Sequence, residues 1–237
     1  MALPKIDQPL FNLTIPSTKE QIRVRPFLVK DEKILLIALE SNDQIQILTA
    51  IQQIVQNCIQ GDVDVTNLPT FDLEYLFVRL RNISVGNVVK LSFLDDSVGD
   101  GGEQINYELD LEDVNVKFPD EPNNIIDIDD TYKLQMKYPS FTTISKIGSA
   151  DMNTDNSFKF ITECIDKLFT TEEVWVLSDS TTTEKTTFLE GLSVETFKKI
   201  NQFFEDAPKL KHTIKYQTRD GIKERTLQGL TDFFMYA

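Results

Sequence analysis

The spacing of apolar side chains changes along this sequence, and the changes restrict the folds open to it. In residues 43–60 apolar residues recur every three or four positions, as on one face of a helix. In residues 105–111 they alternate strictly with polar residues, as on one face of a strand. Helical spacing returns after residue 140, and the hairpin dipeptide Asp220-Gly221 follows it. We therefore expect an α+β fold with an N-terminal β-hairpin plus helices, a central acidic antiparallel β region, and C-terminal helices with a closing β-hairpin.

The sequence divides by character into three zones, residues 1–86, 87–139 and 140–237, which together are also compatible with one compact domain. The first zone predicts a hairpin over residues 11–24 and helices over residues 43–60 and 72–82. Between the hairpin and these helices, residues 34–39 (ILLIAL) predict a short helix that is apolar on all sides. A helix of that kind is expected in a core.

The second zone is rich in predicted strands and carries most of the net charge. Of the 38 acidic residues in the chain, thirteen lie between Asp95 and Asp130, where Lys117 is the single basic residue. This segment therefore has a charge of −12, and the rest of the chain contributes only −2 to the total of −14. The acidity is local, and we expect the segment to repel itself.

The third zone predicts helices and a final hairpin. Phe158, Ile161, Ile165 and Leu168 mark one helix by their spacing. Thr181 followed three residues later by Glu184 is a capping box for a second helix, and Ser193 caps a third.

Composition limits the possible functions. A chain of 237 residues with 41% apolar content is long and apolar enough to bury a core. Its net charge of −14 disfavours nucleic acids and anionic membranes, and its longest apolar run, residues 34–39, is too short to insert into a bilayer. The N-terminal residues lack the apolar run of a signal peptide, so we expect a soluble protein in the cytoplasm where it is made.

The residue types that carry chemistry form no recognisable site, so we expect no enzyme, no cofactor and no metal. His212 is the only histidine, and it lies in a strand pattern. Cys58 and Cys164 are far apart in sequence and each sits in an apolar pattern, as expected for packed thiols. The glycine-rich run at residues 98–103 lacks the lysine of a phosphate-binding loop. Residues 151–156 imitate the start of a calcium loop, but Asn156 and Thr162 replace the required Gly and Glu.

Three features are candidates for a protein interface. One face of the helix at residues 43–60 carries glutamines and no charge, whereas a solvated helix face usually carries Lys and Glu. The aromatic residues Phe233 and Phe234 are either core residues or a docking tail. The acidic strand face is either a solubilising surface or a surface that steers a basic partner. The candidate interface residues are Gln46, Gln52, Gln53, Gln56, Glu108, Asp110, Glu112, Phe233 and Phe234.

Several segments, in order, resemble one known family. They are IRVRPF (22–27), EKILLIALE (32–40), LPTFDLEYLFVRLR (68–81), SVG (84–86), LDLEDVNV (109–116), MKYP (136–139), FFEDAPKLKH (203–212) and GLTDFF (229–234). With these segments the chain resembles the baseplate hub proteins of T-even-like contractile-tailed bacteriophages (myophages), nearly from end to end.

The resemblance implies a hub subunit or hub assembly protein that acts by binding other baseplate and hub proteins, without catalysis or a cofactor. It implies a location in the host cytoplasm during assembly and in the tail baseplate of the virion. Two alternatives remain open at this point. One is a transient assembly chaperone that is absent from the mature virion, and the other is an acidic accessory hydrolase.

Overall fold

The computed structural model describes residues 6–41, 43–97, 101–148 and 154–234, except for the side chains of Gln44, Thr231 and Phe234. Packing contacts divide the chain into two units. Unit 1 comprises Met1–Val65, Phe71–Lys117 and Lys209–Ala237, and unit 2 comprises Thr66–Thr70 and Phe118–Pro208. The zones 1–86, 87–139 and 140–237 follow changes in composition along the chain, so they are a different division from these two units.

Unit 1 begins with a small antiparallel sheet in the order β1-β2-β3. Strands β1 (Phe11–Thr14) and β2 (Gln21–Val24) form the expected hairpin, and β3 (Ile59–Gln60) pairs with β2. Ile22 and Val24 alternate with polar residues in β2, and both are buried. The alternating pattern therefore corresponds to one strand face that lies in the core.

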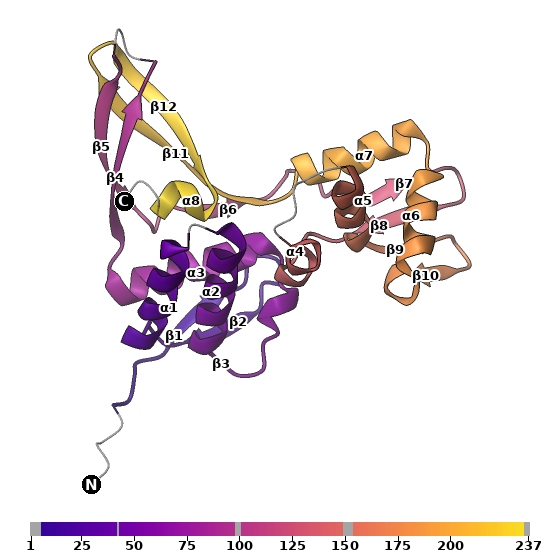
Figure 1. The fold of residues 1–237 in the computed structure, drawn as a ribbon, viewed down its shortest axis with the longest axis horizontal. Helices are drawn as coiled ribbons and strands as arrows, with labels where there is room; N and C mark the ends of the chain where they lie inside the picture. Colours follow the sequence, from indigo (N-terminus) through magenta and orange to yellow (C-terminus); the bar gives the residue numbers. More distant parts are fainter. Residues whose placement is uncertain (1–5, 42, 98–100, 149–153, 235–237) are drawn as a thin grey trace. The chain divides into compact units, whose positions relative to one another are not determined.

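Three helices follow in unit 1, namely α1 (Val29–Glu40), α2 (Gln44–Cys58) and α3 (Thr70–Val85) (Figure 1). The expectation that the apolar segment at residues 34–39 is a core helix is wrong in part. This segment belongs to α1, which packs chiefly against α2, and Leu36 and Ile37 are more than half exposed. Residues 34–39 are apolar on all sides, but α1 packs chiefly against one helix, so part of this segment stays exposed.

The start of α1 depends on a buried carboxylate. Asp31 accepts a hydrogen bond from the backbone N–H of Leu28 at 2.9 Å and forms an ion pair with Arg25 at 2.7 Å. The side chain of Asp31 is fully buried, so these partners offset the cost of removing its charge from water. Together they fix the first turn of α1.

Two hairpins form the rest of unit 1 and lie side by side (Figure 1). The first consists of β4 (Val88–Asp95) and β5 (Glu103–Asp110), and the second of β11 (Lys209–Thr218) and β12 (Gly221–Gln228). Strand β6 (Asn115–Lys117) pairs with β11, and α8 (Gly229–Phe234) follows β12. These elements and α3 share one core, which consists of Val78, Val89, Leu91, Phe93, Ile105, Leu109, Leu111, Val114, Leu210, Ile214, Leu227 and Phe233.

Unit 2 contains an antiparallel sheet in the order β10-β9-β8-β7 and several helices (Figure 1). The strands are β7 (Ile125–Asp127), β8 (Lys133–Met136), β9 (Ile165–Phe169) and β10 (Val174–Val176). The helices are α4 (Phe141–Ile147), α5 (Thr154–Glu163), α6 (Thr182–Glu190) and α7 (Val194–Glu205). The capping box of Thr181 and Glu184 and the cap at Ser193 are confirmed at the starts of α6 and α7.

One expected helix in unit 2 is wrong in its second half. The spacing of apolar residues predicted a helix that continues to Leu168, but α5 ends at Glu163 and β9 begins at Ile165. Strand β9 pairs with β8 on one side and β10 on the other. These pairings satisfy the backbone groups of β9 on both sides, and local spacing does not reveal them.

The structure is an α+β mixture of small antiparallel sheets and helices with a C-terminal β-hairpin, as expected.

Candidate interaction surfaces

The acidic hairpin β4–β5 has one buried and one exposed face. Ile105 and Leu109 point into the core of unit 1, and Glu108 points outward with its side chain 70% exposed. Lys90 lies across from Glu108 in the hairpin, with its Nζ 3.8 Å from Oε1. Because both side chains are solvated, this pair contributes little to stability. Glu108 therefore remains an exposed carboxylate with one weak partner.

Asp110 and Glu112 lie where the chain leaves β5. The carboxylate of Asp110 accepts hydrogen bonds from the Asn87 side chain and from the backbone N–H of Glu112, both at 2.9 Å. Asp110 thus holds the turn after β5, while the side chain of Glu112 is exposed. Of the three candidate carboxylates, Glu108 and Glu112 are the two that face solvent.

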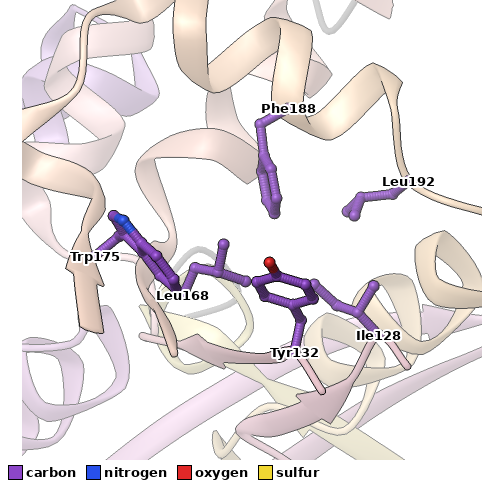
Figure 2. Close-up of a pocket in the computed structure, with 6 residues that line it drawn as sticks. All are labelled: Ile128, Tyr132, Leu168, Trp175, Phe188 and Leu192. Carbon is purple, nitrogen blue, oxygen red and sulfur yellow. The ribbon is translucent and has the colours of Figure 1, made fainter. Parts of the chain in front are cut away.

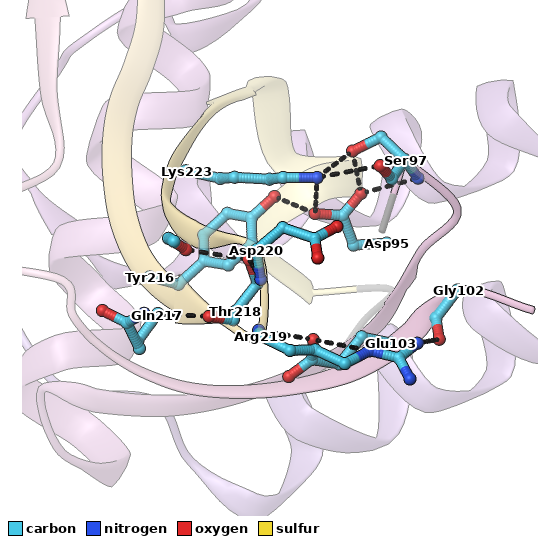
Figure 3. A network of polar contacts seen from close by, with 11 residues as sticks. Asp95, Ser97, Gly102, Glu103, Tyr216, Gln217, Thr218, Arg219, Asp220 and Lys223 are labelled. Carbon is cyan, nitrogen blue, oxygen red and sulfur yellow. Dashed lines mark hydrogen bonds and ion pairs between the residues drawn. The ribbon is translucent and has the colours of Figure 1, made fainter. Parts of the chain in front are cut away.

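Asp95, the last residue of β4, does not belong to this exposed surface. It is only 9% exposed and accepts hydrogen bonds from Ser97 and from the Tyr216 hydroxyl, the latter at 2.9 Å (Figure 3). Lys223 lies 3.9 Å away. The hydrogen bonds from Ser97 and Tyr216, with the charge of Lys223, hold the pKa of Asp95 below its ordinary value. Asp100 lies outside the described residues.

The partners of Asp95 reveal a basic hairpin that the sequence interpretation missed. Residues 209–228, the β11–β12 segment, contain six Lys and Arg residues and two acidic ones. Arg219 donates its backbone N–H to Glu103 at 3.0 Å and its guanidinium to the carbonyl of Gly102 at 2.8 Å (Figure 3). The acidic hairpin is therefore partly neutralised within unit 1 by a segment that is distant in sequence, which the expected self-repulsion of residues 95–130 did not include. The signal in the sequence is the basic balance of residues 209–228, which is opposite in sign to that of the acidic segment.

The glutamine face of α2 is exposed along most of its length. Gln46, Gln53 and Gln56 are exposed, and Gln52 is half-buried. The amide of Gln46 donates to the carboxylate of Asp43, the N-cap residue, at 3.2 Å. Helix α1 thus exposes apolar side chains, and helix α2 exposes uncharged amides.

Of the two C-terminal candidates, the structure describes the side chain of Phe233 but not that of Phe234. Phe233 is fully buried in the core of unit 1, so its ring packs within the chain in this fold. Phe234 ends α8, and its side chain lies outside the described part of the structure, as do residues 235–237.

The residues that could take part in catalysis, His212, Cys58 and Cys164, each have an ordinary structural environment. The Nδ1 atom of His212 is 3.2 Å from the backbone carbonyl of Asp113. Burial raises the pKa of Cys58 to about 11 and that of Cys164 to about 12, so both thiols are protonated at neutral pH. Among residues 6–41, 43–97, 101–148 and 154–234, no group of three or more His, Cys, Asp or Glu side chains is placed to hold a metal ion. Residues 151–153 of the calcium-like segment lie outside the described residues.

Unit 2 contains an apolar pocket of about 400 Å³ that the sequence interpretation did not single out. The residues that line it are Ile128, Tyr132, Leu168, Trp175, Phe188 and Leu192 (Figure 2). The ring centroids of Tyr132 and Trp175 lie 6.2 Å apart, and each of these residues is about 40% exposed. The only sequence signal was the apolar run Val174-Trp175-Val176, which follows two glutamates.

A family model described as T4 bacteriophage base plate protein matches residues 8–235, nearly the whole chain. The chain belongs to this T4 baseplate family. No curated protein and no solved structure matches it significantly.

As a member of the T4 baseplate family, the protein has a structural or assembly role in the baseplate of the phage tail, and its place in the virion is the tail. A structural family of this kind favours a non-enzymatic protein that interacts with other baseplate proteins. In the described part of the chain, the helices are too short or too polar to cross a membrane.

Proposed function

We propose that this baseplate protein is a component of the baseplate hub, that it acts by binding neighbouring baseplate and hub proteins, and that it carries out no reaction. The observations that support binding most directly are the exposed apolar side chains of α1 and the exposed, uncharged glutamine face of α2. Leu36 and Ile37 are 55% and 58% exposed, and Gln53 and Gln56 are exposed on the adjoining helix. The cores of protein interfaces are likewise depleted in charged residues.

The hub assignment is supported by the ordered segments that resemble hub proteins, of which residues 68–81 are the longest. In this proposal the protein is made in the host cytoplasm and joins its partners there, and it neither binds nucleic acid nor inserts into a membrane.

The acidic hairpin supplies a second contact in this proposal. Glu108 and Glu112 face solvent, and exposed carboxylates attract a basic surface over several ångströms. The hairpin steers a basic partner toward the complex, and the apolar residues of α1 with the glutamine face of α2 supply the contact that persists.

A direct binding experiment tests the proposal. The full chain is immobilised, and purified baseplate proteins of the same phage are passed over it one at a time. We expect at least one of them to bind, and we expect Leu36→Asp with Ile37→Asp to weaken that binding. A matched control is Ile222→Asp, which changes an exposed apolar residue on β12 that is 74% exposed. If none of the baseplate proteins binds the native chain, the proposed mode of action is wrong.

A further inference from the structure

Strand β10 in unit 2 is an apolar strand at the edge of a sheet. It pairs with β9 on one side and ends the strand order β10-β9-β8-β7 on the other. Its three residues, Val174, Trp175 and Val176, are 61%, 41% and 44% exposed. An edge strand offers unpaired backbone N–H and C=O groups, and folded proteins protect such an edge by keeping the strand short or by placing charged residues or proline on it. Strand β10 is three residues long and contains no charged residue and no proline.

The apolar pocket of unit 2 opens beside this edge. Trp175 of β10 and Leu168 of β9 are partners in the strand register, so their side chains lie on the same face of the sheet. Tyr132 extends this face, and Phe188 and Leu192 lie opposite it (Figure 2). A strand added to β10 would direct every second side chain to this face, because side chains alternate along a strand. Edge and pocket are thus placed to receive the same segment.

The chain segments that supply the lining residues of the pocket are acidic, and we call their charged residues the acidic rim. Six carboxylates and two lysines lie within two sequence positions of a lining residue, which gives a net charge of −4. These residues are Asp127, Asp129, Asp130, Asp166, Glu173, Glu190, Lys133 and Lys167. Lys133 forms an ion pair with Asp127 at 2.7 Å. Asp129, Asp130, Glu173 and Glu190 are all exposed.

We infer that the β10 edge and its pocket bind an extended segment of a neighbouring baseplate protein, in which one large apolar side chain fills the pocket and Lys or Arg residues flank it. The segment pairs with β10 through its backbone, and its basic residues meet the acidic rim. A second copy of this chain fits less well, because pairing of two β10 edges would bring two acidic rims together. The inference rests on the proposed function, since it names the chemistry of one partner.

Trp175 provides the measurement, because it is the only tryptophan in the chain and lines the pocket. The probe is a seven-residue peptide with phenylalanine at its centre, alternating threonine and valine beside it, and lysine at each end. We expect this peptide to shift the emission of Trp175 in the full chain to shorter wavelength in a saturable manner. Replacing the end lysines by glutamate, or the central phenylalanine by serine, should weaken binding at least ten-fold. Methylating alternate backbone nitrogens of the peptide should have a similar effect, because it removes hydrogen-bond donors.

Two protein variants complete the test. Asp130→Asn with Glu173→Gln should weaken the lysine peptide several-fold, whereas Asp62→Asn, an exposed position in unit 1, should not. If the lysine peptide leaves the emission unchanged at millimolar concentration, or if the glutamate peptide binds as well, the inference is overturned. Self-association in sedimentation velocity that is lost in Phe188→Ser would assign the pocket to a second copy and would also overturn it. If the chain still binds purified baseplate proteins in these cases, only this inference fails and the proposed function stands.

Discussion

Glu74 shows how burial of a single carboxyl group ties stability to pH. It lies on α3, half-buried, with its carboxylate close to Gly229 at the start of α8. Loss of water around the group raises the pKa of Glu74 from its ordinary 4.5 to about 7. Between these values the folded state binds more protons than the unfolded state. The contribution of Glu74 to stability is therefore greatest below about pH 4.5 and is lost as the pH rises through 7.

The variant Glu74→Gln tests this linkage, because glutamine imitates the neutral carboxyl at every pH. We expect it to match the native chain near pH 4.5 and to exceed its free energy of unfolding by on the order of 2–3 kcal/mol at pH 8. Urea unfolding at both values, followed by circular dichroism, measures the difference. Glu32→Gln, an exposed position on α1, is the control and should show no such trend. An equal effect of the two substitutions would contradict the assigned cause.

His212 and Cys164 are the residues that a catalytic role would need most. His212 contacts a backbone carbonyl, and the buried thiol of Cys164 has a pKa of about 12. We expect His212→Ala and Cys164→Ser to leave baseplate assembly intact, with a modest loss of stability from the hydroxyl that Cys164→Ser buries. Baseplate assembly is measured by complementing a phage that lacks this protein with each variant and counting the infectious particles. Loss of assembly by a normally folded variant would show that chemistry is required.

At the scale of single elements, the sequence predicts a helix or strand wherever local signals and packing agree. The caps at Thr181 and Ser193 correctly predicted where α6 and α7 begin, and the Asp220-Gly221 dipeptide correctly predicted the turn between β11 and β12. The predictions were wrong where contacts with other elements decide the secondary structure or the burial of a segment. The apolar spacing from Ile161 to Leu168 fits a helix, but pairing with β8 and β10 makes β9 a strand. The composition of α1 fits a core helix, but α1 packs chiefly against one helix, so part of it stays exposed.

The capping box of α6 is a quantitative test at this scale. Thr181 accepts a hydrogen bond from the backbone N–H of Glu184, whose carboxylate accepts one from the backbone N–H of Thr181. Thr181→Ala should lower the free energy of unfolding of unit 2 by about 1 kcal/mol, because it leaves a helix donor without its partner. Emission of Trp175, which also lies in unit 2, follows the unfolding. Thr183→Ala, at an exposed position inside α6, is the control and should not reduce stability.

At the scale of the whole molecule, the candidate surfaces were only partly predictable. The acidic segment at residues 95–130 looks continuous in sequence, but eight of its thirteen carboxylates belong to unit 1 and five to unit 2. Its basic neighbour, the β11–β12 hairpin, is about a hundred residues away in the chain, so only the fold brings Glu103 to Arg219. Phe233 is in the core because α8 packs back onto the strands. Pairings of distant segments of this kind leave no local signal.

The exposed carboxylates that remain allow a test of steering. Glu108→Gln with Glu112→Gln removes two solvent-facing charges and spares Asp110, which holds a turn. We expect association with a basic baseplate partner to slow several-fold at low salt and to depend less on salt, with little change in dissociation. Surface plasmon resonance at low and high salt measures both rates. Association rates that are identical in the variant and the native chain at every salt concentration would leave this face only a solubilising role.

The central claim is that the protein is built into the baseplate through contacts with its neighbours. Quantitative mass spectrometry of purified virions tests it most directly, with baseplate assembly intermediates from the same infection measured in parallel. We predict that the chain is present in both samples at the same fixed ratio to the other baseplate proteins. Presence in the intermediates together with absence from the virions would contradict the claim and would identify a transient assembly chaperone.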